Sequence, residues 1–266
     1  MLVLIRGAGD LASGIALRLH RAHISVVMTD LEKPTSIRRT VCFSEAIVHG
    51  KTQVEDVWAV RAETKEDVFA ALEKGQIPVL CDEAASCRAW LKPDAVVDAI
   101  LAKRNLGTNM TDAPIVIGAG PGFCAGKDCH AVVETMRGHT LGRAIYDGCA
   151  LENTNIPGLI GGFAGERVLR APKDGVFCGK LAIGTLVEAG DIAGEVDGEP
   201  MRCTIAGVLR GILADGTRVH KGMKAGDVDP RAEGSACHTV SDKALAIGGG
   251  VLEAILHLSG RQTYAK

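Results

Sequence analysis

The first half of the chain alternates short apolar runs with amphipathic stretches. Residues 2–6 (LVLIR) form an apolar run that ends at a glycine, which is typical of a buried parallel strand. Leu11, Ile15 and Leu19 then recur at helical spacing. Further strands are predicted over residues 24–30, 77–82, 95–101, 114–118 and 130–135. Strands that alternate with helices predict right-handed βαβ units and a parallel sheet with helices on both faces.

One predicted helix has clear signals at both ends. Thr64 followed by Asp67 is the pattern of an N-terminal cap, and Gly75 marks the stop. The polar and glycine-rich positions gather elsewhere, after the predicted strands, at Gly7–Gly9, Asp30, Asp82, Asp98 and Gly118–Gly122. Because open α/β sheets bind ligands beyond the carboxyl ends of their strands, we expect a ligand site at this edge.

The second half of the chain is different in character. From about Arg167 it consists of short β-like runs separated by glycines, and it contains a repeat. GTLVEAGDIAGEV begins at residue 184 and GTRVHKGMKAGDV at residue 216, an offset of 216 − 184 = 32 residues. This pattern is similar to the two halves of a biotinyl/lipoyl-type barrel-sandwich hybrid. The stretch between the halves, residues 196–203, has no lysine, so we predict a structural or dimerisation module and not a cofactor carrier.

The predicted fold class is therefore α/β, with a Rossmann-like parallel sheet plus a small all-β domain like a barrel-sandwich hybrid. We expect a ligand-binding α/β domain over residues 1–165 and the β-rich domain over residues 166–235. Residues 236–266 are predicted to form a closing helix that returns to the first domain, with Ser241 as its cap. Gly248–Gly250 interrupt its apolar pattern, and close packing is the favoured reason.

The N-terminal glycine loop, GAGDLA over residues 7–12, fits the dinucleotide fingerprint G-x-G-x-x-G/A between a strand and a helix. In that interpretation glycines bring the backbone close to a phosphate at the helix N-terminus, and Asp30 binds a ribose hydroxyl. Asp10 argues against it, because its charge competes with a phosphate. A turn that binds nothing is the alternative. The predicted cofactor-binding residues here are Gly7, Gly9, Asp10, Gly14 and Asp30.

A second glycine loop, GAGPGF over residues 118–123, predicts an anion-binding nest of backbone N–H groups. It lacks the G-K-[ST] of a phosphate-binding Walker loop. The predicted anion contacts in this region are Gly118, Gly120, Gly122, Lys103, Asn105, Lys127 and Arg137. Arg137 is of the type that binds phosphate in a bidentate manner. Its alternative is an ion pair with Glu134 or Glu152.

Nine cysteines, scattered without CxxC pairs, predict reduced cytosolic thiols and no disulfide framework. Cys124 is a candidate nucleophile, because Lys127 or a helix dipole would lower its pKa. His139 is a candidate general base. For both residues a structural role is the alternative. Cys124, Cys129 and His130 match no usual zinc spacing, so no metal is predicted.

Charge and composition exclude several classes of protein. The 30 Lys and Arg nearly balance 32 Asp and Glu, and aromatic residues are few, so we expect no nucleic-acid partner. No apolar run approaches the length of a membrane span, and the N-terminus does not fit a secretory signal. We expect a cytoplasmic homo-oligomer.

Long segments of the chain resemble the YqeB family, accessory proteins of the selenium-dependent molybdenum hydroxylase system. These segments are KPDAVVDAILAKRN, PIVIGAGPGFCAGKDCHAVVETMRGHTLGRAI, GVLRGILADGTRVHKGMKAGDVDPR and VSDKALAIGGGVLEAIL. The resemblance implies a role in maturing such hydroxylases, with the apoenzyme or its maturation proteins as partners. It also implies selenium or cofactor handling. Together with the glycine loops, this makes a molybdopterin-type cofactor or a dinucleotide the suspected ligand, and in such a pathway Cys124 is a candidate carrier of a persulfide or selenide. An NAD(P)-dependent oxidoreductase and a non-catalytic oligomeric scaffold are the alternatives.

Overall fold

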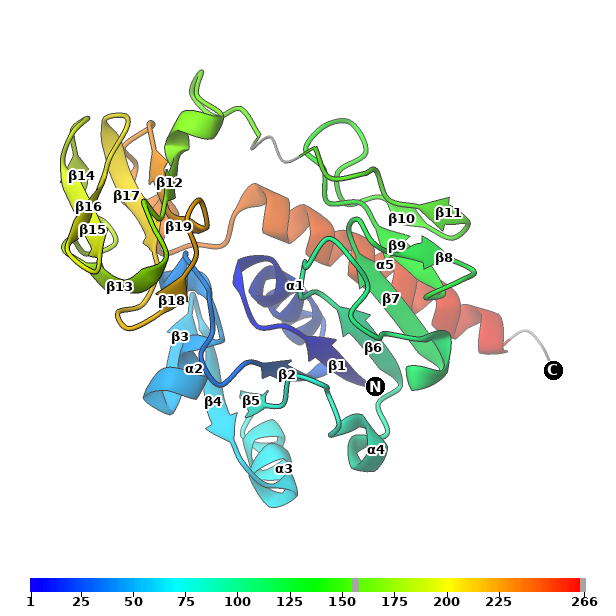
Figure 1. Cartoon of the computed structure of the whole chain (residues 1–266). Coiled ribbons are helices and arrows are strands. Elements are labelled where there is room, and N and C mark those ends of the chain that lie inside the picture. The colour runs from blue at the N-terminus through cyan, green and yellow to red at the C-terminus, as the bar shows by residue number, and fades with distance from the viewer. Residues whose placement is uncertain (155–157, 264–266) are drawn as a thin grey trace. The chain divides into compact units, whose positions relative to one another are not determined.

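The computed structural model describes residues 1–154 and 158–263, with the side chains up to residue 260. The chain divides into two compact units (Figure 1). The α/β unit comprises Met1–Glu32, Phe43–Thr154 and Val240–Lys266, and the β unit comprises Lys33–Cys42 and Asn155–Thr239. No helix among the described residues is long and apolar enough to cross a membrane.

The α/β unit is built on one mixed sheet of nine strands in the order β10-β9-β7-β6-β1-β2-β5-β4-β3. Its strands are β1 (Leu2–Arg6), β2 (Ser25–Asp30), β3 (Lys51–Val54), β4 (Val57–Ala62), β5 (Ile77–Cys81), β6 (Ala95–Asp98), β7 (Ile115–Ala119), β9 (Ala131–Val133) and β10 (Ala144–Ile145). Six parallel strands, β5-β2-β1-β6-β7-β9, follow the Rossmann order 3-2-1-4-5-6. The order of strands therefore reverses between β1 and β6, where such sheets bind their ligands.

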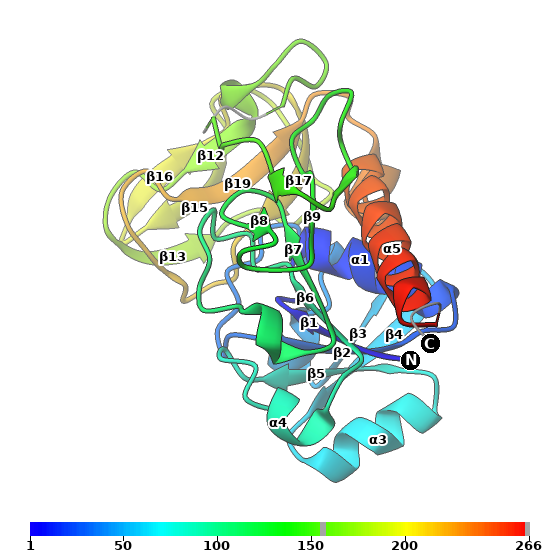
Figure 2. The same ribbon diagram turned by 90° about the vertical axis from the view of Figure 1, so that its right-hand side faces the viewer.

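Helices cover both faces of this sheet. They are α1 (Asp10–Arg21), α2 (Glu45–His49), α3 (Lys65–Glu73), α4 (Arg88–Leu91) and α5 (Asp242–Thr263). Leu4, Val27 and Val96 pack in one cluster with Val68 of α3 and Leu91 of α4. The side chains that alternate with these strand residues point to the other face, where α1 and α5 lie (Figure 2). The predicted cap of α3 is confirmed, because Thr64 and Asp67 form a reciprocal capping box.

The sequence prediction missed the antiparallel edges of the sheet. β3 and β4 form a hairpin at one edge, and β10 pairs antiparallel to β9 at the other. β6 ends at Asp98 and not at residue 101. Soon after Asp98 the backbone turns into a left-handed conformation, with φ of 61° at Leu101 and 63° at Lys103, so the strand cannot continue.

The β unit contains two four-stranded antiparallel sheets, β12-β19-β17-β14 and β16-β15-β13-β18. Its strands are β12 (Val168–Arg170), β13 (Gly175–Gly179), β14 (Leu186–Val187), β15 (Ile192–Val196), β16 (Glu199–Arg202), β17 (Gly207–Ile212), β18 (Arg218–Val219) and β19 (Lys224–Asp229). One apolar core, which includes Phe177, Leu209 and Val228, joins them. Two-residue strands β8 (Cys124–Ala125) and β11 (Gly148–Cys149) pair separately in the α/β unit.

The repeat seen in the sequence is a structural repeat. Strands β12–β15 correspond to β16–β19 after a shift of 32 residues, for example Gly175 to Gly207 (207 − 175 = 32), with φ of 156° and 154°. β13 pairs with β15 and β18, and its counterpart β17 pairs with β19 and β14. Each sheet therefore takes strands from both halves of the repeat.

The unit boundaries differ from the predicted limits of 1–165, 166–235 and 236–266, since the main part of the β unit is Asn155–Thr239 and an earlier segment also belongs to it. Lys33–Cys42 is part of the β unit, although it was expected in the α/β domain. Polar contacts explain this, because Arg38 donates to the carbonyl oxygens of Ala236 (2.8 Å) and Thr239 (3.0 Å), and Arg39 donates to that of Ile212 (2.9 Å). The closing helix α5 does return to the α/β unit, with the Ser241 hydroxyl accepting the N–H of Ala244 (3.2 Å).

Candidate functional site

The loop between β1 and α1 lies at the point where the strand order reverses. Gly7 has a φ of 99°, and a Cβ there would lie 2.8 Å from the carbonyl oxygen of Ala99, which follows β6. Only glycine fits this close approach. Gly9 is the N-cap of α1 and provides no side-chain cap. The N–H groups of Leu11 and Ala12 have no hydrogen-bond partner within the described chain, so they remain available to an anion.

Asp30 ends β2 and holds the glycine loop in place. Its Oδ2 accepts the N–H of Ala8 (2.7 Å), and its Oδ1 accepts the N–H of Leu31 (2.8 Å). Burial raises the pKa of Asp30, and the hydrogen bonds from Leu31 and Ala8 oppose that rise. Each oxygen retains a second lone pair, so the carboxylate can also accept a ligand hydroxyl. The sequence did not show this bracing role.

Two of the residues predicted to bind a cofactor at the N-terminal loop, Asp10 and Gly14, belong to helix α1. Asp10 is the first residue of α1, where its charge suits the positive end of the helix dipole. Gly14 is a correction, because it is buried against α5. A Cβ on Gly14 would lie 2.5 Å from that of Ala244, so this glycine serves helix packing instead of phosphate binding. Gly248 packs against α1 in the same way, because a Cβ on it would lie 2.9 Å from the carbonyl oxygen of Gly14.

A buried polar cluster beneath the edge holds the segment after β6. Arg6 donates to Asp98 (3.2 Å) and to the Thr108 hydroxyl, and that hydroxyl donates to Asp98 (2.6 Å). Arg6 also donates to the carbonyl oxygen of Leu106 (3.4 Å). Arg6 and Asp98 are almost fully buried, and the Arg6 Nε has no partner in the described part of the chain. Sequence analysis missed Arg6, because a charged residue at the end of an apolar strand also fits an exposed position.

Asn105 and Lys103 belong to this segment and behave differently. The Asn105 amide shapes the loop, accepting N–H from Gly107 (2.9 Å) and Thr108 (2.8 Å) and donating one of its two N–H groups to the Thr108 carbonyl oxygen (2.8 Å). Its predicted contact with a cofactor stays a prediction. Lys103 is exposed, and its ammonium has no ion-pair partner among residues 1–154 and 158–260. Desolvation by surrounding protein lowers the pKa of Lys103.

The glycines of the central loop serve close packing. A Cβ on Gly118 would lie 2.4 Å from the Phe123 ring, and one on Gly120 would lie 2.5 Å from the Thr135 hydroxyl. The Gly120 N–H donates to Val133 (2.8 Å), so it is not available to a nest. A Cβ on Gly122 would lie 2.6 Å from the Cα of Arg104, so this loop borders the Lys103 segment as predicted.

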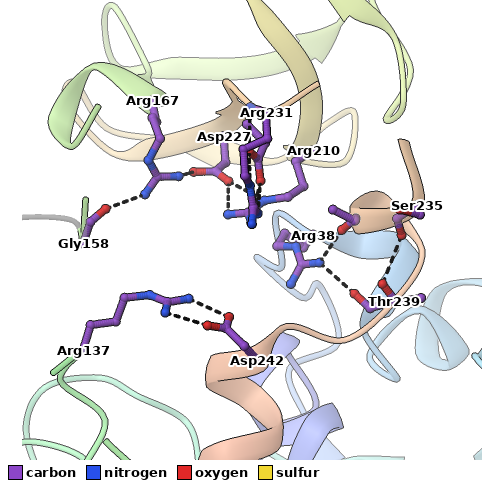
Figure 3. A network of polar contacts seen from close by, with 12 residues as sticks. Arg38, Arg137, Gly158, Arg167, Arg210, Asp227, Arg231, Ser235, Thr239 and Asp242 are labelled. Carbon is purple, nitrogen blue, oxygen red and sulfur yellow. Dashed lines mark hydrogen bonds and ion pairs between the residues drawn. The ribbon is translucent and has the colours of Figure 1, made fainter. Parts of the chain in front are cut away.

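The remaining predicted residues do not join this edge through any contact in the described residues. Lys127 and His139 are exposed. Arg137 binds Asp242 with two hydrogen bonds of 2.7 Å, so its predicted role as a ligand contact is corrected to an ion pair at the start of α5 (Figure 3).

Cys124 forms a disulfide with Cys149. This contradicts the prediction of reduced thiols at these two positions and, in the oxidised form, that of a Cys124 thiolate.

The β unit has a larger buried cluster that sequence analysis missed (Figure 3). Asp227 accepts from Arg167 (3.1 Å) and Arg210 (2.8 Å), and Asp229 accepts from Arg210 (3.2 Å) and Arg231 (2.7 Å). Burial of Asp229 opposes its ionisation, but hydrogen bonds from Arg231 and the charges of Arg210 and Arg231 lower its pKa to about 2. Asp227 and Asp229 lie on β19 and Arg210 lies on the neighbouring β17, so the cluster has the character of a structural network within one sheet.

The geometry therefore defines a Rossmann-ordered α/β unit with a glycine loop at its switch point, together with a two-sheet β unit. No family model matches the chain. The chain is 51% identical over 257 residues to the uncharacterized protein YqeB of Escherichia coli strain K12, which covers 97% of this chain and 48% of that protein. This similarity supports the assignment of the chain to the YqeB family. The chain spans about half the length of this curated relative.

Solved structures give only distant likenesses. A succinylglutamate desuccinylase/aspartoacylase from Rhodobacter sphaeroides is 25% identical but covers 24% of this chain and 22% of its own, with a TM-score of 0.21. An aspartoacylase family protein from Mesorhizobium loti is 13% identical and covers 85% and 83%, with a TM-score of 0.26. The ectoine utilization protein EutE from Ruegeria pomeroyi is 11% identical and covers 85% and 84%, with a TM-score of 0.27. Scores this low carry no argument about fold or function.

Proposed function

We propose that the carboxyl edge of the α/β unit binds a phosphorylated cofactor of the dinucleotide or pterin type, and that the protein is an accessory or maturation factor for a molybdenum hydroxylase. The observation that carries the binding proposal is the glycine loop at the switch point of a Rossmann-ordered sheet, directly before a 12-residue helix. Among residues 1–154 and 158–263, no other segment combines strand order, close backbone approach and open helix N–H groups.

The residues present fit such a ligand. A phosphate would be held by the N–H groups of Leu11 and Ala12 and by the dipole of α1. Lys103 supplies an unpaired positive charge at the same edge. Asp30 retains lone pairs for a ribose hydroxyl or for an N–H donor on a base. The pterin or nucleotide supplies the redox or transfer chemistry, and the chain supplies binding and orientation.

The link to selenium-dependent molybdenum hydroxylases rests on the resemblance to the YqeB family. It makes the hydroxylase apoenzyme or its maturation proteins the proposed partners. The finer assignment of the β unit as a barrel-sandwich hybrid is supported by the exchange of strands between the two halves. The turn at Asp197 and Gly198 offers no lysine for a covalent cofactor, so we assign the module to structure or to homo-oligomer formation.

An NAD(P)-dependent oxidoreductase is the second candidate, and Asp30 is the observation that favours it. A carboxylate at the end of the second strand is the usual partner of an NAD ribose. In this case we expect the same edge to bind NAD, with Asp30 rejecting the additional phosphate of NADP by charge repulsion.

The first test is native mass spectrometry of the protein from cells with an active molybdenum-cofactor pathway, followed by analysis of the released ligand. A molybdopterin-type mass supports the maturation role, and NAD or NADP supports the oxidoreductase. A ligand-free oligomer that binds neither NAD nor guanosine diphosphate in calorimetry contradicts both and favours a scaffold.

The substitution Lys103→Gln tests whether the ligand binds at the proposed edge of the sheet. Loss of a charge-assisted contact to phosphate is expected to weaken ligand binding by about tenfold or more. Lys127→Gln is the matched control, because it removes the same charge from a neighbouring exposed loop. Equal affinity of the two variants for the ligand found by mass spectrometry would place the site elsewhere.

A further inference from the structure

The Cys124–Cys149 disulfide joins two very short strands at the surface of the α/β unit. β8 and β11 have two residues each, and their register pairs Cys149 with Cys124 and Gly148 with Ala125. Cys149 is exposed and Cys124 is half-buried. A ladder this short contributes little by itself, so the disulfide is an important link between the two segments. Because Cys149 is an exposed residue, an external thiol can approach the disulfide from its side.

The other seven cysteines are thiols, and one of them, Cys81, is exposed. A chain built around a disulfide framework normally pairs most of its cysteines. A single surface disulfide among many thiols instead fits the class of redox-sensing or exchangeable pairs. The disulfide also spans only 25 residues, so it does not join distant parts of the chain.

The disulfide is placed directly beside the proposed binding edge. Cys124 follows Phe123, whose ring fills the space left by Gly118. Gly122, two residues before Cys124, lies against the backbone of Arg104. The Cys124 N–H donates to the Asp128 carboxylate (2.9 Å), which closes the turn after the central loop. The link to β11 therefore restrains the same loop that borders the Lys103 segment.

We propose that Cys124–Cys149 is a reversible thiol–disulfide exchange site whose state sets how firmly the central loop is held at the carboxyl edge. A dithiol reductant is the partner. Its thiolate attacks the sulfur of the exposed residue Cys149, the bond between the two cysteine sulfurs breaks, and the Cys124 sulfur leaves as a thiolate that takes up a proton. The second thiol of the partner then attacks the mixed disulfide, releasing Cys149 as a thiolate and the partner as a disulfide. Two electrons pass to the protein, and the dithiol is oxidised.

A third cysteine, Cys129, lies near the disulfide but is a poor candidate for attacking it. The Cys129 sulfur lies 3.8 Å from the Cys124 carbonyl oxygen and is fully buried. Burial raises the pKa of Cys129 to about 11, so it is protonated at neutral pH and is a poor nucleophile toward the disulfide. The exchange therefore depends on a thiol from outside the chain.

The test measures reduction of the pair in the native full chain. The protein is oxidised with glutathione disulfide and incubated with dithiothreitol, and the cysteines are mapped by alkylation and mass spectrometry at successive times. Cys124 and Cys149 are expected to become labelled together, at a rate within about tenfold of that in the denatured chain, because Cys149 is an exposed residue and the attack needs no unfolding. Protection by about a thousandfold or more, or failure to form the disulfide at all, would overturn the proposal.

Hydrogen exchange tests the effect on the loop without any ligand. Reduction is expected to speed exchange of the amides in residues 120–128 by about fivefold or more. Cys149→Ser should reproduce the reduced pattern in both buffers. Cys178→Ser, which removes a partly exposed thiol of the β unit, should leave the redox response intact. Exchange that is the same in both states would refute control of the loop, whether or not the ligand proposed above binds.

Discussion

The two units each bury arginine against aspartate, but the two clusters are built differently. In the α/β unit one arginine, Arg6, meets one carboxylate, one hydroxyl and one carbonyl oxygen. In the β unit, three arginines share Asp227 and Asp229. The first cluster lies beneath a loop at a ligand edge, and the second fastens strands to the segments around them. The comparison separates a cluster that positions a loop from one that stabilises a fold.

The largest expected effect comes from Asp227→Asn. It leaves the buried Arg167 and Arg210 without their main counter-charge, and loss of one partner from a buried pair costs about 3–5 kcal/mol. Denaturant unfolding measures the loss. The control is Glu195→Gln, at the position equivalent to Asp227 in the first half of the repeat (227 − 195 = 32), where the partner Lys180 is exposed. Equal destabilisation by both variants would contradict a special role for the buried cluster.

The second-largest expected effect is a loss of stability of the β unit in acid. The pKa of Asp229 is lowered from 3.8 to about 2 in the folded chain, so its ionisation stabilises the fold above pH 4. That contribution, about 2 kcal/mol, is lost as the pH falls from about 4 through about 2. Chemical unfolding at a series of pH values, compared with Asp229→Asn, measures it. The variant should be less stable at pH 6 and should lose less on acidification. A parallel pH dependence in both proteins would refute the assignment.

The smallest effect is expected from Thr108→Val in the α/β unit. It removes the hydroxyl that joins Arg6 to Asp98 but retains the shape of the side chain, at a cost of about 1–2 kcal/mol. Because this cluster holds a loop, amide exchange should rise mainly in residues 99–108. Thr111→Val, on the same segment with an exposed hydroxyl, is the control. An even rise across the whole α/β sheet would show that the cluster supports the fold and not the loop.

The fold was predictable where periodicity was strong. The runs at residues 2–6 and 77–82 became β1 and β5, and the repeat led directly to the pseudo-symmetric sheets. The hairpin of β3 and β4 was missed, although Val57 and Ala59 alternate with the exposed Trp58, because a short edge strand resembles a loop in composition. Lys33–Cys42 could not be assigned to the β unit, since its contacts are about 200 residues away along the chain.

The candidate site was predicted less well than the fold. Gly7, Gly9 and Asp30 do meet at the switch point, because strand order alone brings them together. Gly14, Gly118 and Gly120 were expected to face a ligand, yet they fit around Ala244, Phe123 and Thr135. A glycine that admits a ligand and one that admits a neighbouring side chain look the same in a sequence. The disulfide was missed because Cys124 and Cys149 pair only once β8 and β11 are placed.

The exchange of strands in the β unit has a consequence for how such a module arises. Neither half closes a sheet by itself, because β13 needs β18 and β17 needs β14. A chain with one half alone would complete its sheets only with a second copy of itself, as a symmetric dimer. The present unit is equivalent to that dimer joined head to tail in a single gene product. Fusion frees the two copies to differ, and the buried Asp227 and Asp229 lie in the second copy, where Arg210 occupies the position equivalent to Cys178 of the first (210 − 178 = 32).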